Sequence, residues 1–343
     1  MRERLPALLR LVVSLVLIAV LLRQVDSEDV LNVLRRAGSR SGFVLAVVAL
    51  LLYAAAIASN ALKWRVLLEA QGVRVPFSSL LRHTFVGVFF NNFLPVIGAD
   101  VVRGYGLARE TSQGSGVAVS VLVDRLVGFL VFTSAGTMAA VFARRWAGLG
   151  AGEHSGALAA VERVGLLATV ALLAGFLILL SGRVRTLVTT LITRIPLVRG
   201  AGPLVLGLSD SVAAYRTQPG ALVTAYTIGL TTVLLSNVVN WLLFAALEIG
   251  IRPIYVFIFN PIIGLVTALP ISVGGLGLNQ NVFPALYGLV GVFTADAVAV
   301  SVVLQLIILL TSLPGGVVWA ATRSQRPDAP APVRPVVARP SDR

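Results

Sequence analysis

The chain has 343 residues, of which 57% are hydrophobic and 13% are charged, and its mean hydropathy is +0.91. Soluble domains carry about 25% charged residues, so this composition excludes a soluble globular protein and predicts an all-α polytopic membrane protein. The absence of cysteine excludes disulfides and thiolate-bound metals, and two histidines leave little for a zinc site.

Nearly all of the net charge of +13 comes from arginine, because Lys63 is the single lysine. Nucleic-acid binding would require basic residues on a soluble face with interleaved aromatic residues, whereas these lie in loops between apolar segments. Loop charges of this kind set membrane topology and attract anionic lipid headgroups. Placing most of these basic residues on the cytoplasmic side requires both termini in the cytoplasm. We therefore predict a protein of the cell (inner, cytoplasmic) membrane with this topology.

Six apolar runs are long enough to cross a bilayer core, which takes about 20 helical residues. They lie at residues 5–22, 43–68, 117–142, 157–181, 220–247 and 295–322. The first begins like a signal peptide, but no small-residue cleavage site follows it, so we expect a retained helix. The Pro- and Arg-rich segment at residues 323–343 is predicted to be a disordered cytoplasmic tail, which leaves one membrane domain at residues 1–322.

Two further apolar stretches are interrupted at a Leu-Pro pair, Leu94-Pro95 and Leu269-Pro270. Non-helical backbone survives inside a bilayer only against protein or a wet cavity. We therefore predict two re-entrant helical hairpins in addition to the six spans. In the expected topology they enter from opposite faces, which is typical of inverted-repeat transporters with a binding site near the midplane.

Charged residues within the apolar segments are candidate binding residues, because they are expensive at that depth. Asp124 and Arg125 are neighbours on a predicted span and cannot face one another. Arg103 and Asp100 in the first hairpin offer the complementary charges, either as a substrate site or as ion pairs that only hold the hairpin in place. The candidates from this region are Asn91, Asn92, Asp100, Arg103, Asp124 and Arg125.

The second hairpin combines glycines with polar residues. Backbone N–H groups beside glycines can approach a ligand, and a helix N-terminus favours an anion, although a tight turn would need the same residues. The candidates here are Ser272, Gly274, Gly275, Gly277, Asn279 and Gln280. Asn237, Asn240 and Gln305 on the last two spans fit interhelical hydrogen bonds better than ligand contacts.

Enzyme motifs are missing from the chain. Trp64 follows the single lysine, so no P-loop Gly-Lys-Ser/Thr is present. No HExxH, GxSxG, CxxC or paired-aspartate metal motif occurs either. We therefore expect a transporter rather than an enzyme, with no cofactor and no metal.

Three motifs carry a family resemblance. NNFLPVIGADVVRGY at residues 91–105, SVLVDRLVG at 120–128 and LPISVGGLGLNQN at 269–281 resemble the lysylphosphatidylglycerol synthase/flippase transmembrane-domain family, also called flippase-like or UPF0104 proteins. The resemblance covers nearly the whole chain. It implies a membrane domain that moves phospholipids or lipid-linked molecules between leaflets.

Some family members carry a soluble synthase domain after this region, and here we expect only the short tail, so lysyl-lipid synthesis is not carried over. The sequence also departs from the family pattern at Asn279-Gln280, where an acidic residue is usual, and at Ala99. The missing carboxylate leaves any acidic role for the second hairpin in doubt.

The function that we expect is a flippase or scramblase for an anionic phospholipid or lipid-linked substrate. A separate lipid-modifying enzyme would be its protein partner. Two alternatives stay open at this stage. A membrane-embedded glycosyltransferase acting on polyprenyl phosphates would use Asp100 and Asp124 as metal ligands. The other alternative is a solute or ion carrier.

Overall fold

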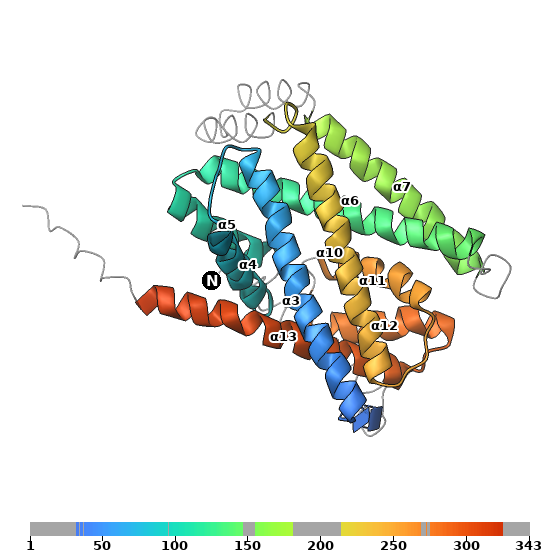
Figure 1. The fold of residues 1–343 in the computed structure, drawn as a ribbon. Coiled ribbons are helices and arrows are strands. Elements are labelled where there is room, and N and C mark those ends of the chain that lie inside the picture. The colour runs from blue at the N-terminus through green and yellow to red at the C-terminus, as the bar shows by residue number, and fades with distance from the viewer. Residues whose placement is uncertain are drawn as a thin grey trace, which may run out of the picture.

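The computed structural model describes residues 32–33, 35–36, 38–94, 96–146, 155–180, 214–268, 272 and 275–324 (Figure 1). Every named element within these ranges is a helix. The predicted first span and nearly all of the predicted tail lie outside the described residues, as do Pro95, Pro270 and Gly274.

Five helices in the described ranges are long and apolar enough to cross a membrane. They are α3 (Arg40–Glu69), α6 (Gly114–Arg145), α7 (Ser155–Leu180), α10 (Pro219–Ala246) and α13 (Thr294–Ser324). Two of these helices begin at residues that favour a helix start. The Ser39 hydroxyl accepts the Gly42 N–H at 3.1 Å at the start of α3, and Pro219 occupies the first turn of α10. Five of the six predicted spans therefore coincide with helices of spanning length, and the count of six spans stays a prediction.

Two pairs of shorter helices interrupt this series where the sequence predicts hairpins. The first pair is α4 (Phe77–Asn91) and α5 (Val96–Thr111), and the second is α11 (Pro253–Ala268) and α12 (Leu278–Tyr287), which the short helix η2 (Gly288–Val290) follows. Their membrane depth and their inverted-repeat relationship stay predictions.

The long helices hold the two pairs in place. In Figure 1, α3 runs alongside α10, while α6 packs against α5, α7 and α11, and α13 packs against both α4 and α12. Close approach of α13 to α4 requires glycine, because a Cβ on Gly315 would lie 2.1 Å from the Phe85 carbonyl oxygen. Both pairs therefore contact α6 on one side and α13 on another.

Asparagines join α10 to α11 in the buried core. The Asn260 amide donates to Asn237 Oδ1 at 2.7 Å, and the Asn240 amide donates to Asn260 Oδ1 at 3.0 Å. The predicted interhelical role of Asn237 and Asn240 is confirmed. Gln305 makes no such bond, since its Oε1 is buried without a hydrogen-bond partner among the described residues.

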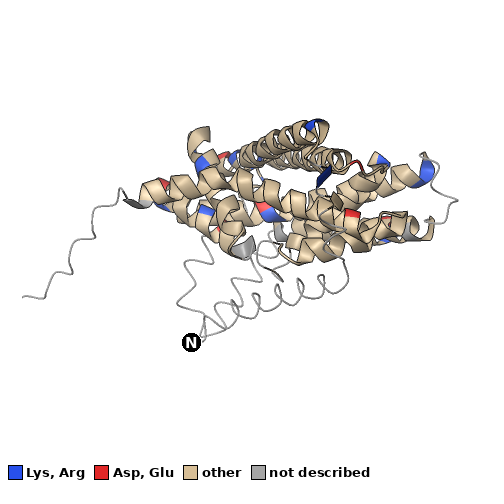
Figure 2. Cartoon of the chain, turned by 90° about the horizontal axis from the view of Figure 1, so that it is seen from below, with Lys and Arg blue, Asp and Glu red and all other residues tan. Residues whose placement is uncertain are grey.

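Charged residues occur at the helix ends and also within the body of the bundle, where basic and acidic residues lie together (Figure 2).

Candidate functional site

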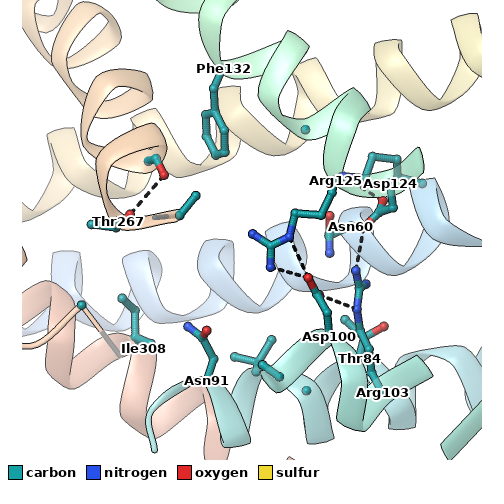
Figure 3. Close-up of a pocket in the computed structure, with 18 of the residues that line it drawn as sticks. Asn60, Thr84, Asn91, Asp100, Arg103, Asp124, Arg125, Phe132, Thr267 and Ile308 are labelled. Atoms are coloured by element: carbon teal, nitrogen blue, oxygen red, sulfur yellow. Dashed lines mark hydrogen bonds and ion pairs between the residues drawn. The ribbon is translucent and has the colours of Figure 1, made fainter. Parts of the chain in front are cut away.

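Five charged side chains from three helices form one continuous network, and Figure 3 labels Asp100, Arg103, Asp124 and Arg125. Lys63 Nζ of α3 lies 3.0 Å from Asp124 Oδ1 of α6. Arg103 of α5 donates from Nη2 to Asp124 Oδ2 at 2.8 Å and from Nε to Asp100 Oδ1 at 3.0 Å. Arg125 Nε donates to Asp100 Oδ2 at 2.7 Å, and its Nη2 contacts the same oxygen. The predicted pairing of Asp124 with Arg103, and of Arg125 with Asp100, is confirmed.

Among the described residues, the network holds three cations, Lys63, Arg103 and Arg125, and two carboxylates, Asp100 and Asp124, which gives it one excess positive charge. Its centre is buried, with the Lys63, Arg103 and Asp124 side chains at 7%, 7% and 5% exposure, and Arg125 is the most exposed of the five at 21%. A net positive charge in a low-dielectric interior is costly even where each cation has partners. The arrangement therefore favours a bound anion near Arg125.

Aromatic packing fixes the Arg103 guanidinium. Its Cζ lies 4.7 Å from the centroid of the Trp64 ring, and the Trp64 indole N–H donates to Ser120 Oγ at 3.0 Å. Gly87 of α4 leaves room for this side chain, because a Cβ there would lie 3.2 Å from Arg103 Cβ. A planar guanidinium can stack flat on the ring while its in-plane N–H groups point at two carboxylates, a fixed geometry that the compact ammonium group does not provide.

The network lines a cavity of about 360 Å³ between the two helix pairs, a volume typical of ligand sites, which span about 300–1,000 Å³. Helices α3, α4, α5, α6, α11, α12 and α13 all contribute to its lining. Asn91 and Asn279 also line it, and the Oδ1 atom of each is buried with no donor among the described residues. An unmet buried acceptor costs about 1–3 kcal/mol, so both are suited to accept a hydrogen bond from a ligand.

The family model for the lysylphosphatidylglycerol synthase transmembrane region matches residues 7–315. The chain belongs to this family. A UPF0104 membrane protein from Pyrococcus horikoshii is 27% identical over 123 residues, which are 35% of this chain and 36% of that protein. The match therefore spans about a third of the relative's length. These findings confirm the family that the three motifs indicate and, with the apolar helices, a multi-pass membrane protein.

The structure brings most of the predicted binding residues of this family member together. Those that line the cavity are Asn91, Asp100, Arg103, Asp124, Arg125, Gly275 and Asn279. Asn91 extends from α4 toward the space below Arg125 (Figure 3). Gly274 lies outside the described residues, and Asn92, Ser272, Gly277 and Gln280 are not part of the lining.

Asn92 has a structural task in the fold. Its amide donates to Ser312 Oγ of α13 at 3.0 Å and to the carbonyl oxygens of Val88 and Phe89, each at 3.2 Å. This residue therefore holds the end of α4 against α13, and its donor group is already used.

Gly277 and Gln280 satisfy each other at the start of α12. The Gly277 N–H donates to Gln280 Oε1 at 2.8 Å, and Gly277 has φ 74°, a conformation that favours glycine. This N–H already has an acceptor in the structure, so a phosphate oxygen would have to displace the Gln280 side chain to receive it. Gly275, with φ 74°, makes room for the Asn279 amide, which a Cβ would approach to 2.9 Å.

Lys63 is the functional residue that sequence analysis missed. The topology argument treats it and Arg103 as loop charges, whereas both are buried in the network. The signal was present, since a lone lysine inside an apolar span is a functional candidate. Asn60 and Tyr53, which precede Lys63 on the same helix, also line the cavity.

Proposed function

We propose that this protein moves an anionic phospholipid or lipid-linked molecule between the two leaflets of the cell membrane, as a flippase or scramblase. The observation that carries the proposal is the buried network with one excess positive charge, which lines a cavity between two broken helix pairs. A phosphate crossing the bilayer needs such a counter-charge, because water is absent there.

The residues of the cavity differ in exposure and in their partners, and we assign them different roles in binding the headgroup. Arg125 is the more exposed of the two arginines, so a phosphate reaches it first and competes with Asp100 for its guanidinium. Arg103 stays fixed between Trp64 and Asp124 and supplies positive charge deeper in the cavity. The Oδ1 atoms of Asn91 and Asn279, which lack a donor among the described residues, would accept hydrogen bonds from hydroxyl or ammonium donors of a headgroup, because ionised phosphate oxygens only accept.

The geometry favours transport over glycosyl transfer. A metal-dependent transferase would use Asp100 and Asp124 as ligands, but Lys63 and Arg103 face Asp124, and Arg103 and Arg125 face Asp100. A divalent cation at either carboxylate would have to displace two positive groups. In the ranges that the structure describes, no cluster of three or more His, Cys, Asp or Glu side chains could hold a metal.

The test is leaflet transfer of labelled phosphatidic acid in phosphatidylcholine vesicles that contain the purified protein. We expect transfer without a change in lipid mass, reduced about tenfold or more in Arg103→Gln because charge-assisted hydrogen bonds are lost. Arg65→Gln is the matched control, since Arg65 forms an exposed pair with Glu69. Absence of transfer would refute the proposal, and a change in lipid mass would favour a transferase.

A further inference from the structure

A second cavity lies beside the charged one, between α5 and α6. Its volume is about 700 Å³, and its lining is mostly apolar. Small residues face it from both helices, Gly104 and Ala108 on α5 and Gly114 and Ala118 on α6. Each pair has i,i+4 spacing and so shares one helix face. These small side chains leave space between the two helices, and we call this space the α5–α6 groove.

The groove and the charged cavity meet at the ion pair between Arg125 and Asp100. Asp100, Arg125, Phe129 and Ala268 line both spaces. In Figure 3, Arg125 reaches from α6 to Asp100 on α5. The most exposed cation of the network therefore lies where a polar cavity becomes an apolar one.

The α5–α6 groove also opens toward the outside of the bundle. Val101, Tyr105 and Leu122 line it and are 63%, 63% and 48% exposed. Leu122 belongs to α6, a helix long and apolar enough to cross a membrane, where an exposed apolar side chain would face lipid chains. An apolar path therefore leads from the bilayer to Arg125.

A third cavity provides an internal comparison. It has a similar volume, about 690 Å³, and lies between α6, α10 and α11 near the other end of α6, with Met138, Phe142 and Leu234 in its lining. It shares no lining residue with the charged cavity. An apolar hollow alone is thus not distinctive, and the shared Arg125 is what sets the α5–α6 groove apart.

We propose that the α5–α6 groove binds an acyl or prenyl chain of the same lipid whose phosphate lies at Arg125, and that the lipid enters sideways between these two helices. This inference rests on the proposed function and names its substrate class. A soluble phosphate needs only the charged cavity, whereas an amphipathic lipid needs a polar and an apolar site that touch. Charge complementarity at Arg125 and continuity of the two spaces identify the occupant as a lipid phosphate with a long chain.

The experiment fills the groove and measures retained lipid. Protein reconstituted in phosphatidylcholine vesicles with phosphatidic acid is extracted in mild detergent, and bound phosphatidic acid per chain is counted by mass spectrometry. Ala118→Trp should lower retention about tenfold or more, because each methylene displaced from an apolar site reduces affinity. The matched controls are Ala171→Trp on the exposed face of α7 and Leu234→Trp in the third cavity, and both should retain lipid like the unmutated chain.

A second route covers the case in which Ala118→Trp fails to fold. The chain has no cysteine, so Ala118→Cys and Ala171→Cys can each be modified with a bulky thiol reagent after folding. Only the modified Ala118→Cys should lose bound phosphatidic acid. Equal retention in the two modified proteins would overturn the groove as a chain site.

The pattern across variants separates this inference from the proposed function. If Arg125→Gln and Arg103→Gln lower retention but filling the groove does not, the charged cavity is supported and the groove inference fails. If neither arginine change lowers retention, the proposed headgroup site itself fails. Loss on both filling the groove and removing Arg125 supports the two sites acting on one lipid.

Discussion

Lys63 of α3 and Asp124 of α6 form a buried ion pair, with Nζ 3.0 Å from Oδ1 and both side chains under a tenth exposed. Asp124 also accepts a hydrogen bond from Arg103 of α5 at 2.8 Å. One carboxylate therefore balances two cations that come from different helices. The long helix α3, the first helix pair and α6 are joined at this point.

Replacing Asp124 should destabilise the fold more than replacing it together with Lys63. Breaking a buried pair costs about 3–5 kcal/mol because a charge is left without compensation. In Asp124→Asn with Lys63→Met, one of the two orphaned cations is removed as well, so part of the loss is restored. Thermal unfolding in detergent measures both variants. Glu69→Gln, which breaks an exposed pair with Arg65, should change stability by about 0–1 kcal/mol, and strictly additive losses would contradict the coupling.

The charge pairs were predictable because buried charges need partners and neighbours on a helix cannot supply them. Asp124 and Arg125 therefore pointed to the first hairpin, where Asp100 and Arg103 follow the Leu-Pro break. The partners of Asn92 and Gln280 were not predictable in this way. Ser312 is distant from Asn92 in the sequence and reaches it only through the crossing of α13 and α4. The Gln280 side chain accepts a hydrogen bond from the Gly277 N–H at the start of its own helix. The residue types alone do not distinguish such a cap from a ligand contact.

Asn279→Ala should weaken lipid binding without weakening the fold. Asn279 Oδ1 lines the cavity and has no donor among the described residues, so its removal relieves an unmet acceptor. We expect unfolding stability to stay the same or rise, while retention of phosphatidylglycerol, whose headgroup hydroxyls can donate to Oδ1, falls. Asn92→Ala is the contrasting variant and should lose about 1 kcal/mol, because its hydrogen bond to Ser312 is made in the folded protein. A stability loss in Asn279→Ala equal to that in Asn92→Ala would indicate a structural role.

Any side chain at Gly275 should lower stability before it affects transport. Its φ of 74° lies in the left-handed region, and a Cβ would meet the Asn279 amide at 2.9 Å. Gly275→Ala should therefore cost about 1–2 kcal/mol in unfolding free energy. Gly220→Ala, at a position on α10 with open space around it, should not be destabilising. Unfolding curves for the two variants that coincide would show that the turn at Gly275 tolerates a side chain.

Stability should fall in acid partly through Glu110, which joins α5 to α4. Burial opposes its charge, but hydrogen bonds from Ser79 at 2.5 Å and from His83, together with the charge of Arg82, outweigh this and lower the pKa of Glu110. Because the pKa is lowered, ionised Glu110 stabilises the folded state fully above the ordinary pKa of 4.5. This stabilisation is lost as the pH falls through the pKa of Glu110 in the folded protein. Glu110→Gln should therefore be less stable near neutral pH, and its difference from the unmutated chain should shrink in acid. A difference that stays constant down to strong acid would contradict this assignment.

The orientation of the bundle can be tested at the two ends of the spans. Burial of Lys63 and Arg103 removes both from the set of loop charges, yet the remaining arginines still lie mainly on the predicted cytoplasmic side. The start of α3 should then face outward and the start of α6 inward. In this cysteine-free chain, the exposed serines Ser41 and Ser115 occupy these positions. An impermeant thiol reagent applied to intact cells should label Ser41→Cys at once and Ser115→Cys only after permeabilisation, whereas labelling of Ser115→Cys in sealed cells would reverse the topology.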